Sequence, residues 1–243
     1  MNIIKLNAID STNDYLKNLL LKNALDNYTI VTADFQNKGK GQRGSQWKSE
    51  TSKNLICSIY INNSNVKLSN QFAINMVVCL AIKKSLNKFN IPQLSVKWPN
   101  DIMSGSLKLC GILIENIVKN KSIQDIVIGI GVNINQMKFN DLPNATSVKQ
   151  ITGKYYNTDE ILSEIVNDIK FYFNFLKEES LVELQKLYES NLYRLNKVST
   201  FKLPDSNLIS GYINGVNDDG RLKIILENDV EESYGIKEIS LIN

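Results

Sequence analysis

Two long apolar runs near the middle of the chain, residues 108–118 and 123–135, constrain the fold more than any other feature. Only the polar turn Lys119-Asn120-Lys121 separates them, so they are predicted to be neighbouring β-strands. Both runs are apolar on both faces for much of their length, whereas a strand with one solvated face alternates. The sequence therefore predicts a sheet that is covered on both sides or that lines a pocket.

Further strands and several helices are predicted around this pair. The strands are expected at residues 2–7, 28–33 and 54–61, and the helices at 72–89, 159–176, 181–192 and from Ser11 onward. After residue 191 the pattern changes to short strands, at 198–203, 208–216, 222–226 and 231–234, with turn residues between them. We predict an α+β fold, with a mixed or antiparallel sheet and packed helices over residues 1–190 and a small β-barrel over 191–243.

Composition excludes several kinds of chemistry. With 43% hydrophobic and 22% charged residues over 243 positions, the chain has ordinary globular composition, and its formal charge of +3 does not by itself indicate a nucleic-acid partner. It has no histidine, which excludes Ser-His and Cys-His nucleophiles and the usual transition-metal ligand sets. Three widely spaced cysteines indicate free thiols in a reducing compartment. With no signal-peptide pattern or apolar stretch of membrane-spanning length, a soluble cytoplasmic protein is expected.

A glycine-rich, basic stretch occupies residues 36–47. Three glycines fall within six positions, interleaved with Lys38, Lys40 and Arg43. Glycine lets the backbone approach a ligand, and basic side chains neutralise phosphate or carboxylate oxygens, while Trp47 can stack on an adenine ring. The residue order is neither a Walker P-loop nor a dinucleotide-binding fingerprint. Taken alone, the stretch is equally compatible with a solvated flexible loop or a loop that contacts nucleic-acid phosphates.

A lysine begins the first of the two central strands. Because side chains alternate along a strand, Lys108 is expected to point the same way as Cys110, Ile112 and Ile114, towards an apolar surface. An unpaired buried charge is costly, so this ammonium needs an anionic partner, which a bound carboxylate or phosphate would supply. The alternatives are an inner salt bridge and a lysine at the strand end that reaches water.

Glycine and turn residues mark two more clusters. In the segment KWPND at 97–101, Asn100 and Asp101 are either site residues or turn formers after the proline. Gly129 and Gly131 lie inside the second central strand, where a glycine marks either the close approach of a ligand or a bulge.

The start of the first helix is a fourth candidate, in the sequence DSTN at 10–13. A helix N-terminus offers free N–H groups, and serine and threonine hydroxyls both donate and accept. This combination suits a neutral ring with a carbonyl and N–H groups, such as a ureido group. Plain helix capping explains Ser11 equally well.

Together and in this order, these segments resemble the biotin–protein ligase family. The resemblance covers nearly the whole chain, through DSTN at 10–13, the loop at 36–47, KWPND at 97–101, KLCGI at 108–112 and GIGVNIN at 129–135. KWPND followed by K-L-x-G-I is highly specific, and the loop is less so. The resemblance implies a class II synthetase-like catalytic domain with a small C-terminal SH3-like β-barrel.

The resemblance also implies a role for individual residues. The biotin-binding set would be Ser11, Thr12, Asn13, Gln36, Lys40, Gly41, Gln42, Lys108, Gly111 and Gly129. The ATP-binding set would be Gly39, Lys40, Arg43, Trp47, Asn100, Lys108 and Asn133. Lys108 and Arg43 are the expected catalytic residues. The ammonium of Lys108 would meet the biotin carboxylate and then the α-phosphate, while Arg43 would assist with the phosphates.

The loop departs from the family pattern G-R-G-R-x-G-R-x-W. Lys40, Gln42 and Ser45 stand where that pattern has arginines. The lysine keeps the charge without the bidentate fork of arginine, and the glutamine keeps only hydrogen bonding. Near the C-terminus, Ile242 stands where some members carry an arginine.

The implied reaction uses ATP and Mg²⁺ to activate biotin as biotinyl-5′-AMP. Biotin is then transferred to a lysine of a biotin carboxyl carrier domain, in acetyl-CoA carboxylase or a related carboxylase. Ser11 has ten residues before it, too few for the DNA-binding domain of some family members, so neither a DNA partner nor repression is expected. An exposed sheet edge would allow a homodimer. The alternatives are a lipoate–protein ligase-like enzyme, which DSTN with KWPND disfavours, and a phosphate- or RNA-binding module.

Overall fold

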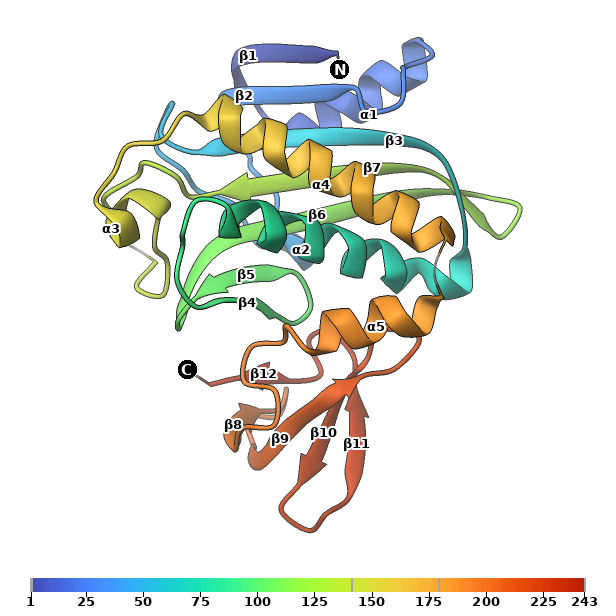
Figure 1. Ribbon diagram of the computed structural model, residues 1–243, viewed down its shortest axis with the longest axis vertical. Coiled ribbons are helices and arrows are strands. Elements are labelled where there is room, and N and C mark those ends of the chain that lie inside the picture. The colour runs from blue at the N-terminus through green and yellow to red at the C-terminus, as the bar shows by residue number, and fades with distance from the viewer. Residues whose placement is uncertain (1, 141, 179, 243) are drawn as a thin grey trace.

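The computed structural model describes residues 2–140, 142–178 and 180–242, with the backbone alone for Arg43 and residues 63–65. Two sheets are present (Figure 1), a seven-stranded mixed sheet in the order β1-β2-β3-β7-β6-β5-β4 and a five-stranded antiparallel sheet in the order β11-β10-β9-β8-β12. The strands of the larger sheet are β1 (Ile3–Ile9), β2 (Ile30–Gln36), β3 (Leu55–Lys67), β4 (Leu94–Lys97), β5 (Asp101–Ser104), β6 (Leu107–Lys119) and β7 (Ser122–Val132). Those of the smaller sheet are β8 (Ser199–Lys202), β9 (Leu208–Val216), β10 (Leu222–Leu226), β11 (Glu231–Tyr234) and β12 (Ser240–Leu241).

Helices pack on both faces of the larger sheet. The α-helices are α1 (Thr12–Lys22), α2 (Gln71–Asn87), α3 (Val148–Thr152), α4 (Thr158–Glu178) and α5 (Leu181–Glu189), with short 3-10 turns η1 (Gln42–Gly44) and η2 (Leu68–Asn70). Figure 1 shows α2 and α4 lying across one face of this sheet, while α1 lies behind the other. The predicted α+β fold with a mixed sheet and packed helices is confirmed; β4, β5, α3 and β12 were not predicted from the sequence.

The only parallel pair in the described sheets is β1 with β2, in register from Ile3 opposite Ile30 to Ile9 opposite Gln36. A parallel pair needs a crossover connection, and α1 supplies it. The crossover places the N-terminus of α1 directly after the end of β1 and beside the end of β2. Residues of DSTN and Gln36 therefore meet at one edge of the fold.

The two long central strands form a hairpin, as their apolar runs predict. β6 pairs antiparallel with β7, and β7 pairs antiparallel with β3. The connection has positive φ at both Asn120 (51°) and Lys121 (60°), which matches the twist of a hairpin through a type I′ turn. Most of the apolar positions of these strands are buried, because helices cover the sheet on both sides.

The core lies mainly between the sheet and the pair α2 and α4. Inward residues of β3, β6 and β7 pack there against almost every apolar residue of α2, including Ile74 and Ile82, which are fully buried. A smaller cluster on the opposite face joins Leu16 of α1 to Val31, Tyr60 and Val127. Because α1 covers only part of that face, the rest of it is open to form a cavity.

The C-terminal sheet is not a closed barrel. Among the described residues β11 pairs only with β10, and β12 pairs only with β8, so the expected SH3-like barrel is an open five-stranded sheet. The edge strands are short, and the segment between them closes on itself through a bridge from Ile236 to Ile239. The predicted division of the chain at 190/191 stays a prediction, and the chain crosses between the sheets through residues 191–193, which pair with β4.

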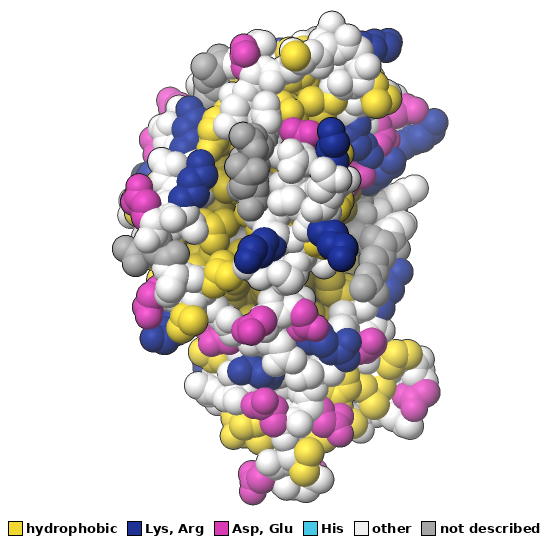
Figure 2. All heavy atoms as spheres, turned by 90° about the vertical axis from the view of Figure 1, so that its right-hand side faces the viewer, with side chains coloured by type: hydrophobic (Ala, Val, Ile, Leu, Met, Phe, Trp, Pro, Cys, Tyr) yellow, Lys and Arg dark blue, Asp and Glu magenta, His cyan; other side chains and the backbone are white. Residues whose placement is uncertain are grey.

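Charge is distributed without a dominant sign on the side of the molecule shown in Figure 2. Basic and acidic side chains are interspersed there over both sheets. This agrees with the small net charge of +3. None of the helices that the structure describes is both long and apolar enough to cross a membrane.

Candidate active site

A cavity of about 210 Å³ lies on the face of the larger sheet that α1 leaves partly open. Its floor is formed by β3, β6 and β7, one wall by the start of α1, and its cover by the segment between β2 and β3. The lining residues are Ser11, Thr12, Asn13, Gln36, Lys40, Gly41, Gln42, Ser45, Gln46, Trp47, Ile56, Cys57, Asn100, Asp101, Lys108, Gly111, Ile112, Leu113, Gly129, Ile130 and Gly131. Segments far apart in the sequence therefore meet in one place.

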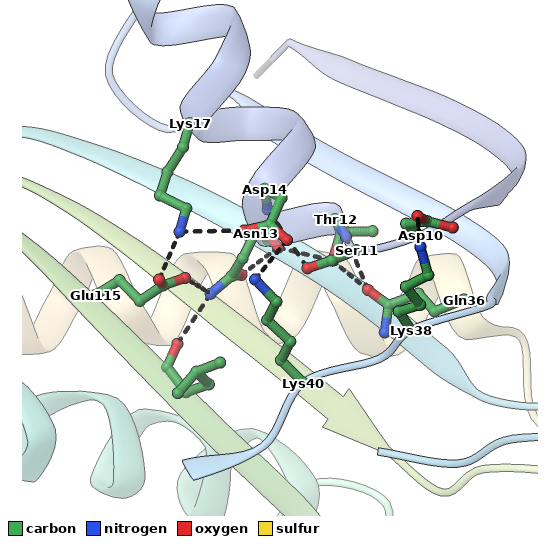
Figure 3. Close-up of polar contacts among 12 residues, drawn as sticks. Asp10, Ser11, Thr12, Asn13, Asp14, Lys17, Gln36, Lys38, Lys40 and Glu115 are labelled. Carbon is green, nitrogen blue, oxygen red and sulfur yellow. Dashed lines mark hydrogen bonds and ion pairs between the residues drawn. The ribbon is translucent and has the colours of Figure 1, made fainter. Parts of the chain in front are cut away.

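The start of α1 is tied to the end of β2. Ser11 is the N-cap, and its hydroxyl accepts from the backbone N–H of Asp14 at 3.4 Å. Thr12 donates twice to the side-chain oxygen of Gln36, from its backbone N–H at 2.8 Å and from its hydroxyl at 3.0 Å (Figure 3). These bonds occupy the carbonyl end of the Gln36 amide, which leaves its Nε2 group as the end that can donate to a ligand.

Asn13 lies flat against the sheet. Its carboxamide occupies the space over Gly129, where an added Cβ would stand 2.5 Å from Asn13 Oδ1. Asn13 Nδ2 donates to Glu115 Oε2 at 2.7 Å and contacts the carbonyl of Leu113 at 3.5 Å, while Oδ1 accepts from the Ser58 hydroxyl at 2.5 Å. The register of β3 and β7 is continuous around Gly129, so this glycine marks a close approach and not a bulge.

Ion pairs tie the covering loop to α1. Lys38 Nζ lies 2.8 Å from Oδ2 of Asp10, just before α1, and Lys40 Nζ lies 2.6 Å from Oδ2 of Asp14 in the first turn of α1 (Figure 3). The hydrogen bond from Lys38 lowers the pKa of the Asp10 carboxyl, although both groups are exposed to solvent. Exposed pairs of this kind contribute little stability, so the loop can exchange them for contacts with an anionic ligand.

Trp47 covers two side-chain-free positions on the floor of the cavity. An added Cβ would stand 2.9 Å from its ring at Gly111 and 2.4 Å from its ring at Gly131. These two glycines face each other across β6 and β7. The indole Nε1 is buried and has no hydrogen-bond partner in the described structure, so it is a donor that a ligand in the cavity can satisfy.

The orientation predicted for Lys108 is wrong. The β5–β6 pairing shifts register so that Ile102 pairs with Cys110 but Met103 pairs with Lys108, which leaves Leu109 as an extra residue. The bulge interrupts the alternation, so Leu109 and Cys110 are both fully buried in the core while Lys108 turns to the opposite face, beside Gly111. Lys108 therefore lines the cavity and does not point at the apolar core.

Lys108 already has an acidic neighbour. Its Nζ lies 2.7 Å from Asp101 Oδ1, without the angular geometry of a hydrogen bond, and 5.9 Å from the centre of the Trp47 ring. The inner salt bridge considered from the sequence is therefore present, between side chains that are 37% and 23% exposed. Asp101 begins β5 and is not merely a turn former after Pro99.

A second cavity, of about 260 Å³, adjoins the first and shares Gln46, Trp47, Asp101 and Lys108 with it. Its remaining lining residues are Lys48, Lys97, Met103, Asn133, Leu142, Pro143, Asn144 and Ala145. Burial lowers the pKa of the Lys97 ammonium, against the attraction of Asp101. Lys48, Lys97 and Lys108 place three basic side chains around this cavity beside Asp101, which favours an anionic ligand.

The cavities offer no nucleophile for covalent catalysis by cysteine. Cys57 lines the first cavity, but burial raises the pKa of its thiol to about 12. The other two cysteines are also buried, and burial raises their pKa values. A neutral buried thiol is a poor nucleophile. The described lining residues instead offer electrostatic stabilisation of an anion at Lys108 and hydrogen bonding at a polar end formed by Asn13 and Gln36.

Comparison with known proteins identifies the family. The sequence model described as the biotin/lipoate A/B protein ligase family matches residues 6–133, more than half of the chain. The chain belongs to this family. Within it, the bifunctional ligase/repressor BirA of Bacillus subtilis is 25% identical over 244 residues, covering 98% of this chain and 72% of the relative. A biotin–[acetyl-CoA-carboxylase] ligase of Mycobacterium tuberculosis is 23% identical, covering 79% of this chain and 71% of the relative.

A solved structure shares the whole architecture of this ligase. The biotin protein ligase from Aquifex aeolicus, in complex with biotin and ATP, gives a TM-score of 0.82 at 27% identity, over 99% of this chain and 98% of that chain. These likenesses confirm the resemblance drawn from the sequence motifs. They also confirm the expectation of a biotin ligase enzyme.

The structure brings most of the predicted site residues of this ligase together. Those that line the first cavity are Ser11, Thr12, Asn13, Gln36, Lys40, Gly41, Gln42, Trp47, Asn100, Lys108, Gly111 and Gly129. Asn133 lines the second cavity, and its Oδ1 is buried without a partner among the described atoms. Gly39 lies outside both linings, packed against the backbone of Trp47, and the side chain of Arg43 lies outside the described residues. Their roles towards ligands stay predictions.

The sequence motifs missed several residues that shape the site. The sequence does not decide between a site role and a turn for Asp101, and the structure places its carboxylate beside Lys108. Ser58 and Glu115, which hold Asn13, were not singled out at all. Ser58 and Glu115 could have been found as polar residues within otherwise apolar strands, because a buried polar side chain needs a hydrogen-bond partner.

Proposed function

We propose that this ligase activates biotin with ATP to form biotinyl-5′-AMP and then transfers the biotinyl group to a lysine of a biotin carboxyl carrier domain. The observation that carries the proposal is the joining, in one cavity, of a neutral polar end at Asn13 and Gln36 to the ammonium of Lys108. Biotin has two ends that complement these, a neutral ureido ring and a negatively charged carboxylate. The Aquifex aeolicus ligase with biotin and ATP bound supports this assignment through its shared fold.

The ring end of the cavity matches a ureido group in polarity. Asn13 Oδ1 accepts from Ser58 and keeps a second lone pair for a ligand N–H, while Gln36 Nε2 can donate to a ligand carbonyl. A ureido ring presents a carbonyl flanked by N–H groups. Among the described side chains, the charged groups beside this end are paired with one another, as Lys17 is with Glu115 and Lys40 with Asp14, so a neutral ring fits it better than an ion.

The opposite end suits the activation step. The biotin carboxylate attacks the α-phosphorus of ATP, forming the acyl-phosphate bond as the bond to pyrophosphate breaks. Two anions must approach each other, so the main requirement is positive charge at the reacting atoms. Lys108 supplies it from the first cavity, with Lys97 and Lys48 around the second. The Trp47 ring, on Gly111 and Gly131, offers a flat face for the adenine.

Loop closure would protect the mixed anhydride from water. In this structure the Lys40 ammonium is paired with the Asp14 carboxylate. If the ammonium exchanged Asp14 for the phosphate of the adenylate, the loop would be drawn over the intermediate. In the second step the neutral amine of the acceptor lysine attacks the acyl carbon. The new amide bond forms as the bond to AMP breaks.

Magnesium enters the reaction as part of the nucleotide substrate. No group of three acidic, cysteine or histidine side chains gathers at one point among the described residues. Magnesium commonly binds through substrate phosphates with one or two carboxylates, and Asp101, beside Lys108, is a carboxylate that lines the cavity.

Pyrophosphate exchange tests the first step directly. Purified protein should exchange labelled pyrophosphate into ATP only when biotin and Mg²⁺ are present. Lys108→Ala should lower that exchange by about 100-fold or more, the size of effect typical when a stabilising charge is removed from a reacting centre. Lys5→Ala is the matched control, because Lys5 is an exposed lysine paired with Asp159, away from the cavity, and its loss should leave exchange unchanged.

The choice of organic acid decides between the two ligase types in the family. Exchange that requires lipoate in place of biotin would overturn the biotin assignment while leaving adenylation intact. Exchange with neither acid would contradict the proposed reaction altogether. Transfer is then measured as incorporation of labelled biotin into a purified carrier domain.

A further inference from the structure

Glu115 is an acidic residue on β6 that stands just outside the cavity lining. One carboxylate oxygen, Oε2, accepts from Asn13 Nδ2 at 2.7 Å, and the other, Oε1, accepts from Lys17 Nζ at 2.6 Å (Figure 3). Its side chain is 31% exposed, so these contacts lie partly out of water. No step of the proposed reaction uses this residue.

Glu115 and its neighbours fix which way the Asn13 amide points. An ionised carboxylate only accepts hydrogen bonds, so the amide must turn its nitrogen towards Glu115. The carbonyl of Leu113, 3.5 Å from Nδ2, is also an acceptor, and the fully buried Ser58 hydroxyl donates to Oδ1. Both N–H groups are thus directed at the protein, and the second lone pair of Oδ1 is what remains for a ligand.

Lys17 prevents Glu115 from charging the ring site. Its ammonium contacts Glu115 and, at 3.1 Å, Asp14 on the same helix. Partial burial by itself lowers the pKa of Lys17, but the hydrogen bonds to Glu115 and Asp14 outweigh that effect and leave the pKa raised. The carboxylate is therefore neutralised from the side away from Asn13, and the cavity stays suited to an uncharged ring.

We propose that Glu115 is a positioning residue that determines ring specificity, by holding Asn13 as a hydrogen-bond acceptor towards the ring. This inference rests on the proposed function. A ring that carries N–H groups, such as ureido, satisfies the free lone pair of Asn13 Oδ1. A dithiolane ring has no N–H and would leave the second lone pair of this buried oxygen without a donor, which disfavours it, because sites built to hydrogen-bond a substrate reject analogues that lack the group.

A polarity swap tests the assignment. Glu115→Gln gives the partner a donor group, so the Asn13 amide loses its fixed direction. Asn13→Asp places a second carboxylate at hydrogen-bond distance from Glu115, where like charges repel. In the double variant Asn13→Asp with Glu115→Gln, the glutamine amide can donate to the aspartate, and residue 13 presents an oxygen to the ring once more.

The measurement is biotin affinity by titration calorimetry on the full chain, with the KM for ATP and thermal unfolding recorded alongside. Glu115→Gln should weaken biotin binding about 10-fold, roughly the contribution of one hydrogen bond, because the ring N–H loses its fixed acceptor on Asn13, and the KM for ATP should be unchanged. Asn13→Asp should weaken it further, and the double variant should recover at least 10-fold relative to Asn13→Asp. Glu160→Gln, an exposed glutamate of α4, is the matched control and should bind as the original protein does.

The outcomes separate the positioning role from a structural one. Additive losses in the double variant, or unchanged biotin affinity in Glu115→Gln, would overturn the assignment. So would a parallel loss of ATP affinity and melting temperature, which general disruption of the fold produces. If the unmodified protein binds no biotin, the proposed function fails and this inference with it. If the protein binds biotin and the swap does not recover affinity, only the inference fails.

Discussion

Gly111 and Gly131 face each other across β6 and β7, and the pair allows Trp47 to lie flat on the sheet. A side chain at either position would occupy the space of the indole ring. Gly129, two residues before Gly131 in β7, does the same for Asn13. The glycines of KLCGI and GIGVNIN therefore act through the side chains that cover them, Gly111 and Gly131 under Trp47 and Gly129 under Asn13.

Gly131→Ala should displace Trp47. The new Cβ would stand 2.4 to 2.8 Å from three ring atoms, so the indole must move off the strand. We expect the KM for ATP in the exchange assay to rise about 10-fold, with little loss of stability, because alanine is tolerated in a strand. Combining the change with Trp47→Ala supplies the control: the three atoms nearest to the new methyl group all belong to the ring, so without the ring the double variant should be no worse than Trp47→Ala. A further loss in the double variant would show that Gly131 acts independently of the ring.

At the same scale, sequence reasoning selected residues that meet in one cavity, but it did not orient all of them correctly. Lys108 was singled out as a lysine in need of an anion, and an acidic neighbour is present, but its face was assigned by strict alternation. The extra residue at Leu109 moves the side chains that precede it in the strand to the opposite face of the sheet. No residue type in KLCGI indicates that a bulge occurs there. For Asp101 the nearby Pro99 kept a turn open as an alternative, whereas its backbone pairs with Gly111 in the sheet.

Helices α2 and α4 are joined by a buried charge as well as by apolar packing. Asp168 is only 4% exposed, and it contacts Lys84 at 3.1 Å, Lys88 at 2.8 Å and the Ser85 hydroxyl at 2.8 Å. Burial alone would raise the pKa of the Asp168 carboxyl, but these partners outweigh it and lower the pKa. Removing one member of such a group leaves the other charges without compensation.

Asp168→Asn should lower the free energy of unfolding by about 3 kcal/mol at pH 7, since it breaks a buried ion pair. Asp159→Asn on the same helix is the control, because the Lys5–Asp159 pair is 61% and 57% exposed and should contribute less than about 1 kcal/mol. Urea unfolding of both variants measures the difference. Equal effects at the two positions would contradict the assignment of Asp168 to the stabilising contact between α2 and α4.

The same pair of variants predicts a pH dependence. Because the folded-state pKa of Asp168 is depressed, its contribution is complete above the unfolded pKa, near 4, and is lost as pH falls through the folded value. The stability gap between the original protein and Asp168→Asn should therefore be constant from pH 7 to pH 5 and shrink below about pH 4. A gap that widened on acidification would require the opposite shift.

The elements themselves were largely predictable, and the exceptions share a physical cause. Long strands and helices such as β6, β7, α2 and α4 carry enough periodic positions to be read from sequence. β4 and β5 have four residues each and are separated by residues 98–100, so the alternation of polar and apolar residues in each strand is too short to recognise. They are held by tertiary contacts, since Val96 pairs with the segment at 191–193 and with β5. The open C-terminal sheet, expected as a barrel, likewise depends on the pairing of short edge strands.

Over the whole molecule, the two sheets share one hydrophobic core. Phe201, Ile213 and Leu222 of the smaller sheet belong to the same buried cluster as α2 and the larger sheet. Trp98, in the segment that leads to Asn100 and Asp101, donates from Nε1 to the carbonyl of Gly220 at 2.9 Å. The C-terminal sheet thus braces the strand pair that presents these site residues, which links its packing to the geometry of the cavity.

A shared core predicts a single cooperative unfolding transition, with the calorimetric and van't Hoff enthalpies equal. A substitution at Gly220 should disrupt the packing between the two sheets, because a Cβ there would stand 2.3 to 2.9 Å from the Phe72 ring of α2. Gly220→Ala should push the sheets apart and broaden or split the transition. Gly153→Ala carries the same left-handed backbone strain, with φ of 73° against 87°, but its Cβ would meet nothing within 4 Å, so it should lower the melting temperature without splitting the transition. Two transitions in the original protein would mean that the apolar contact between the sheets is too weak to couple them. If the two alanine variants showed the same unfolding transition, the effect of Gly220→Ala would come from backbone strain and not from the steric clash with Phe72.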